Sequence, residues 1–559
     1  MLKNRFFPCA LLALSQCAFA QQPPPQPPSA GSQQIPQVPA PQKIAPKVDV
    51  QPIGAPSISG VDSQRIQVKS LRVTGSKAYS ETELLALTGF QSGSELSLAD
   101  LRGMAARITD HYRRNGYFVA QAYLPAQEIK DGVVTIAVID GQYGKVTLRN
   151  QSNLSDDVPN GILGGLNSGD PITSEPLENR LLLLSDIPGV NVKSTLAPGA
   201  SVGASDLIVD VTPGRRVTGS IDADNGGNRY TGEYRLGATV NLNNLAGRGD
   251  VASLRVLTSG SGLNYARASY QMQFGKARVG VAYSWLGYEL GKEFKPLQAH
   301  GTARIASIYG SYPLIRSRNS NLYAGLAFDH KTFQDKIDLP PPPSVTDRKV
   351  KVLMPSLYGD ARDNFGGGGL TTYSLTWYTG NLDIETPAAR QMDAATARSN
   401  GHYNKIGLSA ARIQSVTDSF SLYAAINGQL ASKNLDISEK MELGGMYGVR
   451  AYPEGEAYGD EGYLLNLEAR LRLPKFSEQQ PGQVHLIGFV DTGTITVNKE
   501  PWLAGTNRRT LSGAGIGINW SETNNFVARA YYAHKIGNAV ATSAPDKSGR
   551  FWIQVVKYF

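Results

Sequence analysis

The mature part of this chain lacks cysteine. Both cysteines, Cys9 and Cys17, lie within residues 1–20. That stretch has a positively charged start, an apolar middle and a small-x-small cleavage site (Ala-Phe-Ala at 18–20), as a removed signal peptide does. An alternative interpretation makes Cys17 a lipidated cysteine, although Gln16 is too large for the position before one. The mature protein can hold neither a disulfide framework nor a thiolate metal site. A thiol-free chain suits passage through an oxidising periplasm.

The sequence also lacks long hydrophobic runs. After the signal peptide no stretch reaches the ~18 apolar residues of a membrane-spanning helix, and the mean hydropathy is −0.25. These features disfavour a helical membrane protein. A membrane barrel stays possible, because alternating strands hide their hydrophobicity from window averages. The 59 glycines and 26 tyrosines favour a barrel, since glycine suits curved strands and turns and tyrosine suits interfacial girdles.

Signals of enzymes and of nucleic-acid binding are scarce. The net charge of +8 is spread along the chain without a Lys/Arg block, which gives no support to nucleic-acid binding. The six histidines show no metal-ligand spacing. No nucleophile elbow, carboxylate pair or phosphate loop stands out. The sequence thus predicts no catalytic residue, no metal site and no cofactor.

The N-terminal third divides into a linker and two small modules. Residues 21–60 are rich in proline and glutamine, a composition that predicts an extended or disordered linker. Two α/β modules are predicted at 66–142 and 143–213. In the first, Ser97 and Asp100 have the spacing of a capping box at the start of a helix. Strands are predicted over 117–123 and over Val133–Ile139, the second of which alternates in polarity. The second module repeats the scheme, with its helix predicted over 175–185.

From residue 214 to 559 the chain alternates with a period of two. In 463–473, leucine and alanine side chains occupy one face, and Asn466, Glu468 and Arg470 occupy the other. Charges on one face of a long strand predict one side in hydrocarbon and the other in a wet lumen. About sixteen such segments can be placed, including starts near 320, 350 and 369. The prediction is a closed antiparallel barrel that ends at the aromatic Phe559.

Two short motifs lie near the end of this region. The longest late connection, 433–461, carries Val449-Arg450-Ala451-Tyr452. A following strand carries Phe489, Asp491 and Gly493, whose side chains point the same way because strand residues alternate.

Together these features resemble the two-partner secretion transporters, the haemolysin-activator family. The segments 123–127 (Tyr-Leu-Pro-Ala-Gln), 131–133 (Asp-Gly-Val) and 196–199 (Leu-Ala-Pro-Gly) resemble joints of polypeptide-transport-associated (POTRA) domains. The resemblance implies an outer-membrane barrel with two periplasmic POTRA domains. It also implies export of a large adhesin, haemolysin or toxin, captured through its N-terminal secretion domain. Phe559 would then be the signal for insertion into the lipid of the outer membrane by the barrel-assembly machinery.

The resemblance also implies a lock inside the barrel. In the family a loop folds into the lumen, and its arginine, here Arg450, reaches a wall aspartate, here Asp491. Val449, Tyr452, Phe489 and Gly493 would support this pair, while Ala451 stands where glycine is usual. In a wet lumen the pair is expected to contribute only ~1 kcal/mol. The alternative is that Arg450 is solvated and Asp491 pairs with Arg470.

Three rival functions remain open on the sequence. A barrel-assembly insertase shares the lock and the modules, but usually carries more than two modules. A passive porin or adhesin would not need the modules. An outer-membrane hydrolase has the least support. A pore plug formed by the N-terminal segment is disfavoured by the prolines within 21–60.

Overall fold

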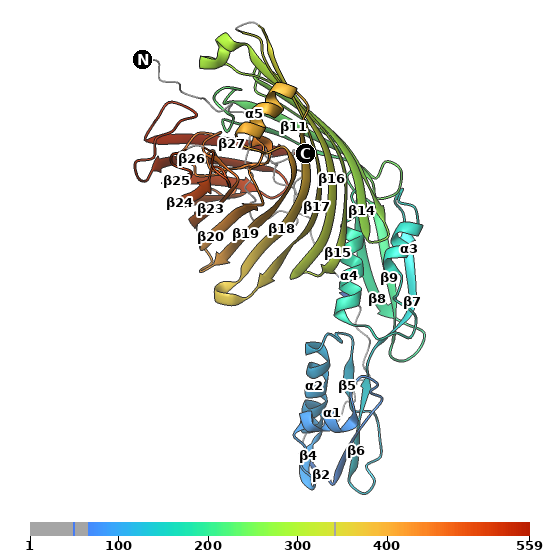
Figure 1. Ribbon diagram of the computed structural model, residues 1–559. Coiled ribbons are helices and arrows are strands. Elements are labelled where there is room, and N and C mark those ends of the chain that lie inside the picture. Colours follow the sequence, from blue (N-terminus) through green and yellow to red (C-terminus); the bar gives the residue numbers. More distant parts are fainter. Residues whose placement is uncertain (1–47, 51–64, 340–341, 503) are drawn as a thin grey trace. The chain divides into compact units, whose positions relative to one another are not determined.

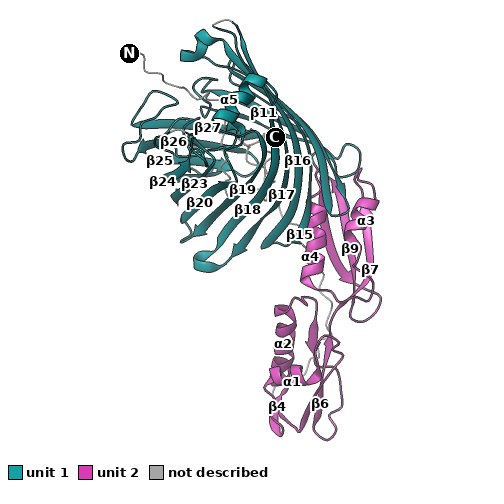
Figure 2. Cartoon of the chain, viewed as in Figure 1, with its two compact units in different colours: residues 1–43, 215–559 teal, residues 44–214 magenta. Residues whose placement is uncertain are grey.

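The computed structural model describes residues 48–50, 65–339, 342–502 and 504–559. The predicted signal peptide and all of the predicted linker except 48–50 lie outside these residues. Two compact units are present, one comprising 44–214 and the other containing 215–559 (Figure 2). Among the described helices, none is long and apolar enough to cross a membrane.

The first module packs two helices against short strands around an apolar core. Ser97 caps its longer helix, and the Asp100 side chain bonds back to the Ser97 backbone, so the predicted capping box is present. Buried side chains of this helix include Leu101 and Ile108. The elements are β2 (Arg65–Val68), β3 (Ser70–Thr74), α1 (Glu81–Thr88), β4 (Ser94–Ser97), α2 (Leu98–Arg114), β5 (Gln121–Tyr123) and β6 (Val133–Ile139).

Two details of this module differ from the sequence-based expectation. Helix α1 was not predicted, although Ser80 and Glu83 form a second capping box at its start. The strand predicted over 117–123 is shorter, because Tyr117 and Ala120 still form turn hydrogen bonds after α2. Local turn geometry therefore decided where this strand begins.

The second module has a four-stranded sheet in the order β1-β8-β9-β7. One strand comes from the linker region: β1 (Val48–Val50) pairs in parallel with β8, residue 48 opposite Ser194. A strand that covers a sheet edge protects its unpaired backbone groups. The other elements are β7 (Gln142–Asn150), α3 (Asp157–Leu163), α4 (Ser174–Ser185), β8 (Val190–Pro198) and β9 (Ala204–Pro213).

The second unit is a closed antiparallel barrel of sixteen strands, which confirms the predicted fold class (Figure 1). The largest difference in a strand start is at β17, expected near 350 and observed from Ser344. The strands are β10 (Val217–Asp224), β11 (Arg235–Asn243), β12 (Val251–Thr258), β13 (Leu263–Phe274), β14 (Ala277–Glu289), β15 (Ala299–Arg316), β16 (Ser320–Ile337), β17 (Ser344–Asp363), β18 (Gly369–Ile384), β19 (Gly401–Ser415), β20 (Phe420–Ala431), β23 (Glu461–Arg472), β24 (Gln483–Thr496), β25 (Arg508–Glu522), β26 (Phe526–Lys535) and β27 (Gly549–Tyr558).

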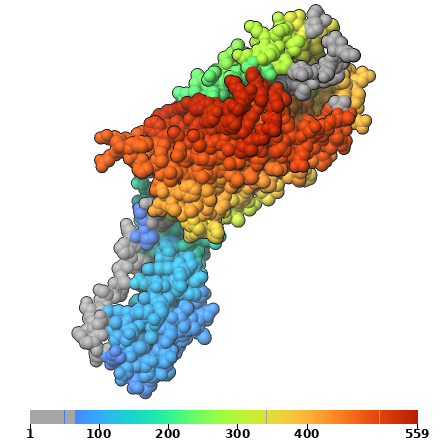
Figure 3. All heavy atoms as spheres, turned by 90° about the vertical axis from the view of Figure 1, so that its left-hand side faces the viewer, coloured from blue at the N-terminus to red at the C-terminus, as the bar shows by residue number. Residues whose placement is uncertain are grey.

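Barrel strands alternate as the sequence predicts. On β23 the side chains of Tyr463 and Leu467 are exposed on the outer surface, while Asn466 and Glu468 are buried inside. The late strands, orange to red, form a continuous outer wall (Figure 3). The barrel closes where β27 pairs with β10, and Phe559 exchanges two backbone hydrogen bonds with Gly219 at this seam.

The connections between strands carry the remaining helical turns and one small ladder. They are η2 (Lys292–Leu297), η3 (Phe365–Gly367), α5 (Pro387–Ala395), η4 (Ile437–Glu439), β21 (Met441–Glu442) and β22 (Tyr458–Gly459). The last three belong to the connection 433–461, in which β21 and β22 pair as antiparallel strands at the neck of a hairpin.

Candidate functional site

The long connection 433–461 is buried inside the barrel. Leu443, Val449, Ala451 and Tyr452 are fully buried, as only core residues normally are. The loop turns back on itself: Val449 N donates to the carbonyl of Leu443 (2.6 Å), and Gly445 N donates to the carbonyl of Tyr452 (3.1 Å). The Arg450 side chain stands at the tip of this turn.

Arg450 forms a bidentate ion pair with Asp491. Its Nε donates to Asp491 Oδ2 and its Nη2 to Asp491 Oδ1, each at 2.8 Å. The Arg450 backbone N also donates to Asp491 Oδ2, at 3.1 Å. The third guanidinium nitrogen, Nη1, donates to Glu468 Oε1 at 2.8 Å. The structure thus brings the two predicted residues together and adds Glu468, whose lumen-facing position on β23 was visible in the sequence. We call this cluster the tip anchor.

Neighbouring side chains fix the tip anchor in place. The Arg450 guanidinium lies over the Phe489 ring, 3.5 Å from its centroid, in a cation–π contact. Asn466 Nδ2 donates to Asp491 Oδ1 (2.8 Å), and the Trp552 indole N–H donates to the Arg450 carbonyl (2.7 Å). The guanidinium nitrogens, the backbone N–H and the carbonyl of Arg450 therefore all have a partner from the wall.

The other predicted residues have distinct places in the site. Val449 packs in the apolar cluster around the tip. The Tyr452 hydroxyl donates to the Ala539 carbonyl at 3.0 Å. Gly493 leaves room for the loop, because a Cβ there would lie 2.7 Å from Leu443 Cδ2. Phe559, the predicted insertion signal, lies at the barrel seam and does not belong to this cluster.

Ala451 is accommodated by a glycine on the opposite wall. A Cβ added to Gly513 of β25 would stand 2.4 Å from the Ala451 Cβ, closer than side-chain atoms can approach. The usual glycine of the motif is thus replaced by alanine on the loop, and the close approach is made by a glycine on the barrel.

Arg470 does not pair with Asp491, so that alternative is wrong. Its Nη2 lies 2.7 Å from Glu468 Oε2, on the same strand and face. Glu468 therefore bridges Arg450 and Arg470, while Asp491 accepts hydrogen bonds from Arg450 and Asn466. Asp491 is bound by Arg450 and Asn466 and has no ion pair with Arg470.

The expectation of a wet lumen at the tip anchor is also wrong. The side chains of Arg450 and Asp491 are 4% and 0% exposed, and that of Glu468 is 1% exposed. The loop itself and the rings of Phe489 and Tyr531 exclude water. Removing one partner of such a buried pair typically costs ~3–5 kcal/mol, well above the ~1 kcal/mol of a solvated pair.

A second set of buried ion pairs holds the start of the loop. Glu439, from η4, accepts from Lys331 Nζ at 2.5 Å, and Lys405 Nζ lies 3.0 Å from its other carboxylate oxygen. Lys405 also donates to the Glu439 carbonyl (2.9 Å) and lies over the Tyr378 ring. The three charged side chains are at most 1% exposed.

Asp436 adds a further contact to this set. It accepts from Arg348 Nη1 of β17 at 2.6 Å. We call the contacts of Asp436 and Glu439 with the wall the base anchor. Sequence reasoning missed it, although lysines at lumen-facing positions of β16 and β19 facing two acidic loop residues were an available signal.

The returning limb of the loop is tied to the connection between β26 and β27. The Glu456 carboxylate accepts from the backbone N–H of Thr542 (2.9 Å) and of Ser543 (2.8 Å). It also forms an ion pair with Arg509 of β25. The loop is therefore attached at its start, its tip and its return.

Comparison with known proteins identifies the family. The description "Haemolysin secretion/activation protein ShlB/FhaC/HecB" fits residues 203–520, more than half of the chain, and "POTRA domain, ShlB-type" fits 66–141. The heme/hemopexin transporter protein HuxB of Haemophilus influenzae (strain 86-028NP) is 32% identical over 475 residues, covering 84% of this chain and 82% of HuxB. The chain belongs to the haemolysin secretion/activation family.

Other relatives of this family member agree in fold. The outer membrane transporter CdiB of Dickeya dadantii is 24% identical, covering 81% of this chain and 79% of that protein. The structure of CdiB from Escherichia coli superposes with a TM-score of 0.67 at 20% identity, covering 91% of this chain and 93% of CdiB. BamA from Haemophilus ducreyi, without its POTRA domains 1–3, gives a TM-score of 0.53 at 15% identity. The chain is an outer-membrane two-partner secretion transporter that secretes an exoprotein, as the sequence predicted.

Proposed function

We propose that the connection 433–461 is the gate of this transporter and that the tip anchor is its lock. The single observation that carries this proposal is the buried, two-pronged contact of Arg450 with Asp491. The loop lies where an exported chain has to pass, so export requires it to move. Because the contact is buried, the closed loop should dominate in the absence of cargo, and binding of the cargo would shift the population towards the open state.

We propose that the periplasmic modules select the cargo. The module at 66–142 would act as a first POTRA domain and that at 143–213 as a second, and they would bind the N-terminal secretion domain of the exoprotein. Addition of a cargo strand to a sheet edge is a physically suitable mode, since backbone hydrogen bonds then bind an unfolded chain. In the second module β1 already covers part of the β8 edge. The edge strands that β1 leaves available are β3 and β5 of the first module and β7 of the second, and each of them could accept a cargo strand.

We propose a cargo related to that of the heme/hemopexin transporter. The supporting observation is the identity of 32% to HuxB, against 24% to CdiB of Dickeya dadantii over a similar length. The higher identity to HuxB favours a cargo of the class that HuxB exports over one of the class that CdiB exports. Export would proceed without nucleotide hydrolysis, with folding of the cargo outside providing direction.

We further propose that Phe559 is read by the barrel-assembly machinery during insertion. Its side chain remains 46% exposed while its backbone is bonded to Gly219, so the ring is available at the seam. A terminal aromatic ring that stays partly exposed at the seam suits recognition by an external partner.

The secreted proteome separates dedicated transport from barrel assembly. Cells without this chain should lose one large secreted protein and keep normal levels of other outer-membrane barrels. Broad loss of barrels would instead support the insertase alternative. Deleting 66–213 should leave a heat-modifiable barrel that exports nothing, and unimpaired export by that variant would contradict the role of the modules.

A further inference from the structure

The outer surface of β14–β18 changes from apolar to cationic towards the end of the barrel that holds the long loop. That end lies opposite the ends at which β10 begins and β27 terminates, because antiparallel strands alternate in direction. The chain reaches β10 directly from the periplasmic modules, so the loop end is the cell-surface end. Strands β15, β16 and β17 are long, with 18, 18 and 20 residues, and extend furthest toward it.

An apolar band covers the middle of these strands. Ile308, Phe328 and Leu353 lie side by side on three neighbouring strands, as the pairing Ile308–Phe328 and Phe328–Leu353 shows. All three point outward and are 59%, 40% and 39% exposed. Large apolar side chains exposed in a row on a barrel wall are the surface that contacts lipid acyl chains.

Cationic side chains follow directly above this band. One rung toward the cell surface, His330 pairs with Lys351, and one rung further Thr332 lies between Arg304 and Lys349. Strands are spaced by about 4.8 Å, so Arg304 and Lys349 stand about 10 Å apart, with Lys351 on the same face as Lys349. Four side chains that carry or can acquire positive charge thus occupy one outward patch. We call these four residues the cationic patch.

Two members of the cationic patch have no anionic partner within the described part of the chain. The side chains of Arg304 and Lys351 are exposed and take part in no ion pair there. Lys349 is bridged to Glu385 at 2.5 Å. Acidic neighbours are present but engaged: Asp347 accepts from Gln334 at 2.8 Å, and Asp383 pairs with Arg390.

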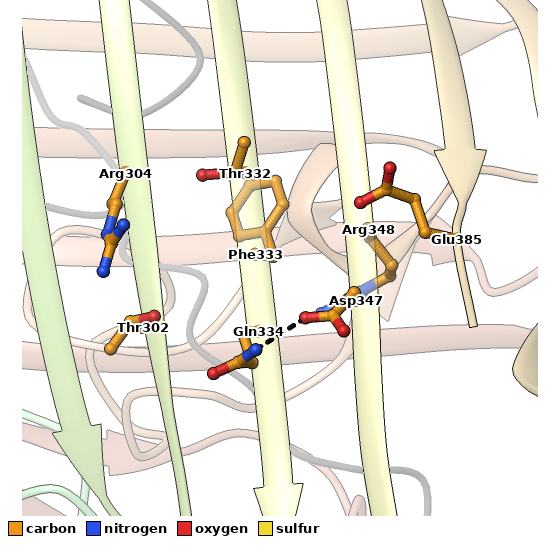
Figure 4. Close-up of a pocket in the computed structure, with 8 residues that line it drawn as sticks. All are labelled: Thr302, Arg304, Thr332, Phe333, Gln334, Asp347, Arg348 and Glu385. Carbon is orange, nitrogen blue, oxygen red and sulfur yellow. Dashed lines mark hydrogen bonds between the residues drawn. The ribbon is translucent and has the colours of Figure 1, made fainter.

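The patch borders a small recess. Its volume is about 150 Å³, and Arg304, Thr332, Gln334, Asp347 and Glu385 line it from β15, β16, β17 and the end of β18 (Figure 4). Arg304 stands on the side of the recess away from the two carboxylates, as the close-up shows. The recess therefore has the Arg304 guanidinium on one side and the two carboxylates on the other.

Aromatic residues mark the height of the membrane boundary at this patch. Trp285 of β14 lies directly beside Arg304 in the strand pairing and is 37% exposed, and Tyr283 lies one rung lower with 52% exposed. Trp and Tyr on barrel walls concentrate where acyl chains give way to head groups. The cationic patch therefore lies at the depth of the head groups of the outer leaflet.

We propose that Arg304, Lys351, Lys349 and His330 bind the phosphate groups of the bisphosphorylated glycolipid of the outer leaflet, lipid A. The apolar band below would contact its acyl chains. Arginine and lysine are the side chains that bind phosphate by charge-assisted hydrogen bonds. The partner of this patch is thus a lipid of the membrane in which the barrel sits, held at the strands that carry the base anchor on their inner face.

Binding of lipid A to the intact purified protein in detergent tests the proposal. Native mass spectrometry would be used to titrate three probes: bisphosphorylated lipid A, its fully dephosphorylated form and inorganic phosphate. The wild-type protein should bind the bisphosphorylated lipid at least about tenfold more tightly than the dephosphorylated form. The variant Arg304→Gln with Lys351→Gln should lose this preference.

The matched control removes two exposed cations elsewhere at the same end, Arg508→Gln with Lys547→Gln, and should keep the preference. Equal loss in the control, or equal binding of both lipids by the wild-type protein, would overturn the proposal. Displacement of the lipid by millimolar inorganic phosphate would also overturn it, since the site would then bind free phosphate. The four substituted positions of the site variant and the control variant are exposed. Both variants should therefore keep the heat-modifiable mobility of a folded barrel. If the site variant still failed to fold, binding of lipid A by the wild-type protein should weaken with rising salt, and salt-independent binding would overturn the proposal.

Discussion

The tip anchor and the base anchor of the long loop have opposite charge arrangements. At the tip, one loop cation, Arg450, is shared by two wall carboxylates on β23 and β24. At the base, one loop carboxylate, Glu439, is shared by two wall ammonium groups on β16 and β19. The wall residues that bind Arg450 are therefore acidic, and those that bind Glu439 are basic. A loop with the reverse pattern fits in only one orientation, because the wrong one would place like charges together.

The chemistry of the two anchors differs as well. The guanidinium of Arg450 is planar and meets Asp491 at two points, so the tip depends on geometry as well as on charge. The ammonium groups of Lys331 and Lys405 are point charges that tolerate small displacements, so the Glu439 contacts of the base anchor depend mainly on charge. We therefore expect the tip to be the specific lock and the base to be the more tolerant attachment.

Substitution of Arg450 should have the largest effect. Arg450→Ala leaves Asp491 buried without its cation and Glu468 with Arg470 alone, at a typical cost of ~3–5 kcal/mol. Export should be impaired and the loop should become accessible to thiol labelling through a single introduced cysteine. Asp491→Ala should act similarly, and the double variant should be little worse than either, because each change removes the same contact. Full additivity in a double-mutant cycle on secretion would contradict the lock.

Substitution at the base anchor should have the next largest effect. Glu439→Gln leaves Lys331 and Lys405 without a buried counter-charge, so the start of the loop should loosen while the tip stays bound. Labelling of cysteines placed at each end would reveal this, and equal loosening of both ends would show that the anchors are not separate. Burial alone would raise the pKa of Glu439, but Lys331 and Lys405 hold it at about 2, below the usual 4.5.

The depressed pKa of Glu439 fixes the sign of the pH dependence. Its contribution is complete above pH 4.5 and is lost only as the pH falls through about 2. Acidification from pH 7 to pH 5 should therefore leave cysteine labelling at the base unchanged. Opening of the base between pH 7 and pH 5 would contradict the assignment.

A conservative change at the tip should have a moderate effect. Arg450→Lys keeps the positive charge but loses the two-pronged contact with Asp491 and the flat cover of Phe489. Export should lie between those of the wild type and Arg450→Ala, at equal surface levels of the barrel. Full activity of the lysine variant would mean that charge alone forms the lock.

Arg470→Gln should have the smallest effect. Arg470 pairs with Glu468 and lies over the Tyr423 ring, and Glu468 keeps Arg450 as a partner after the change. We expect secretion close to that of the wild type. This variant is therefore a control for the removal of a positive charge near the lock. A loss as large as that of Arg450→Ala would show that Arg470 takes part in the lock.

Most of the fold could be predicted from the sequence, because both units contain local sequence patterns that indicate their strands and helices. Period-two alternation is required in every barrel strand, since one face meets lipid and the other the lumen, and this placed the strands to within a few residues. The capping box at Ser97 likewise located helix α2. The pairing of β1 with β8 was not predictable, because Val48–Val50 has no pattern of its own and gains its structure from the edge it covers.

The site was predicted only in part, for a physical reason. Arg450 and Asp491 were identified by motifs, whereas no motif marks Lys331 and Lys405, the partners of Glu439. Such contacts depend on how far the loop enters the lumen. Burial of the ion pairs was missed for the same reason, since the water content of a lumen depends on what fills it.

The most direct test of the account is a disulfide that holds the loop in the lumen. Leu443→Cys with Gly493→Cys places one thiol on the loop and one on the wall, where Leu443 Cδ2 now lies 2.7 Å from the position of a Cβ on residue 493. The chain has no other cysteine beyond residue 17. Oxidised cells should export nothing, and reduction should restore export to the level of the single variants. Normal export by the cross-linked transporter would contradict the claim that the loop has to leave the lumen.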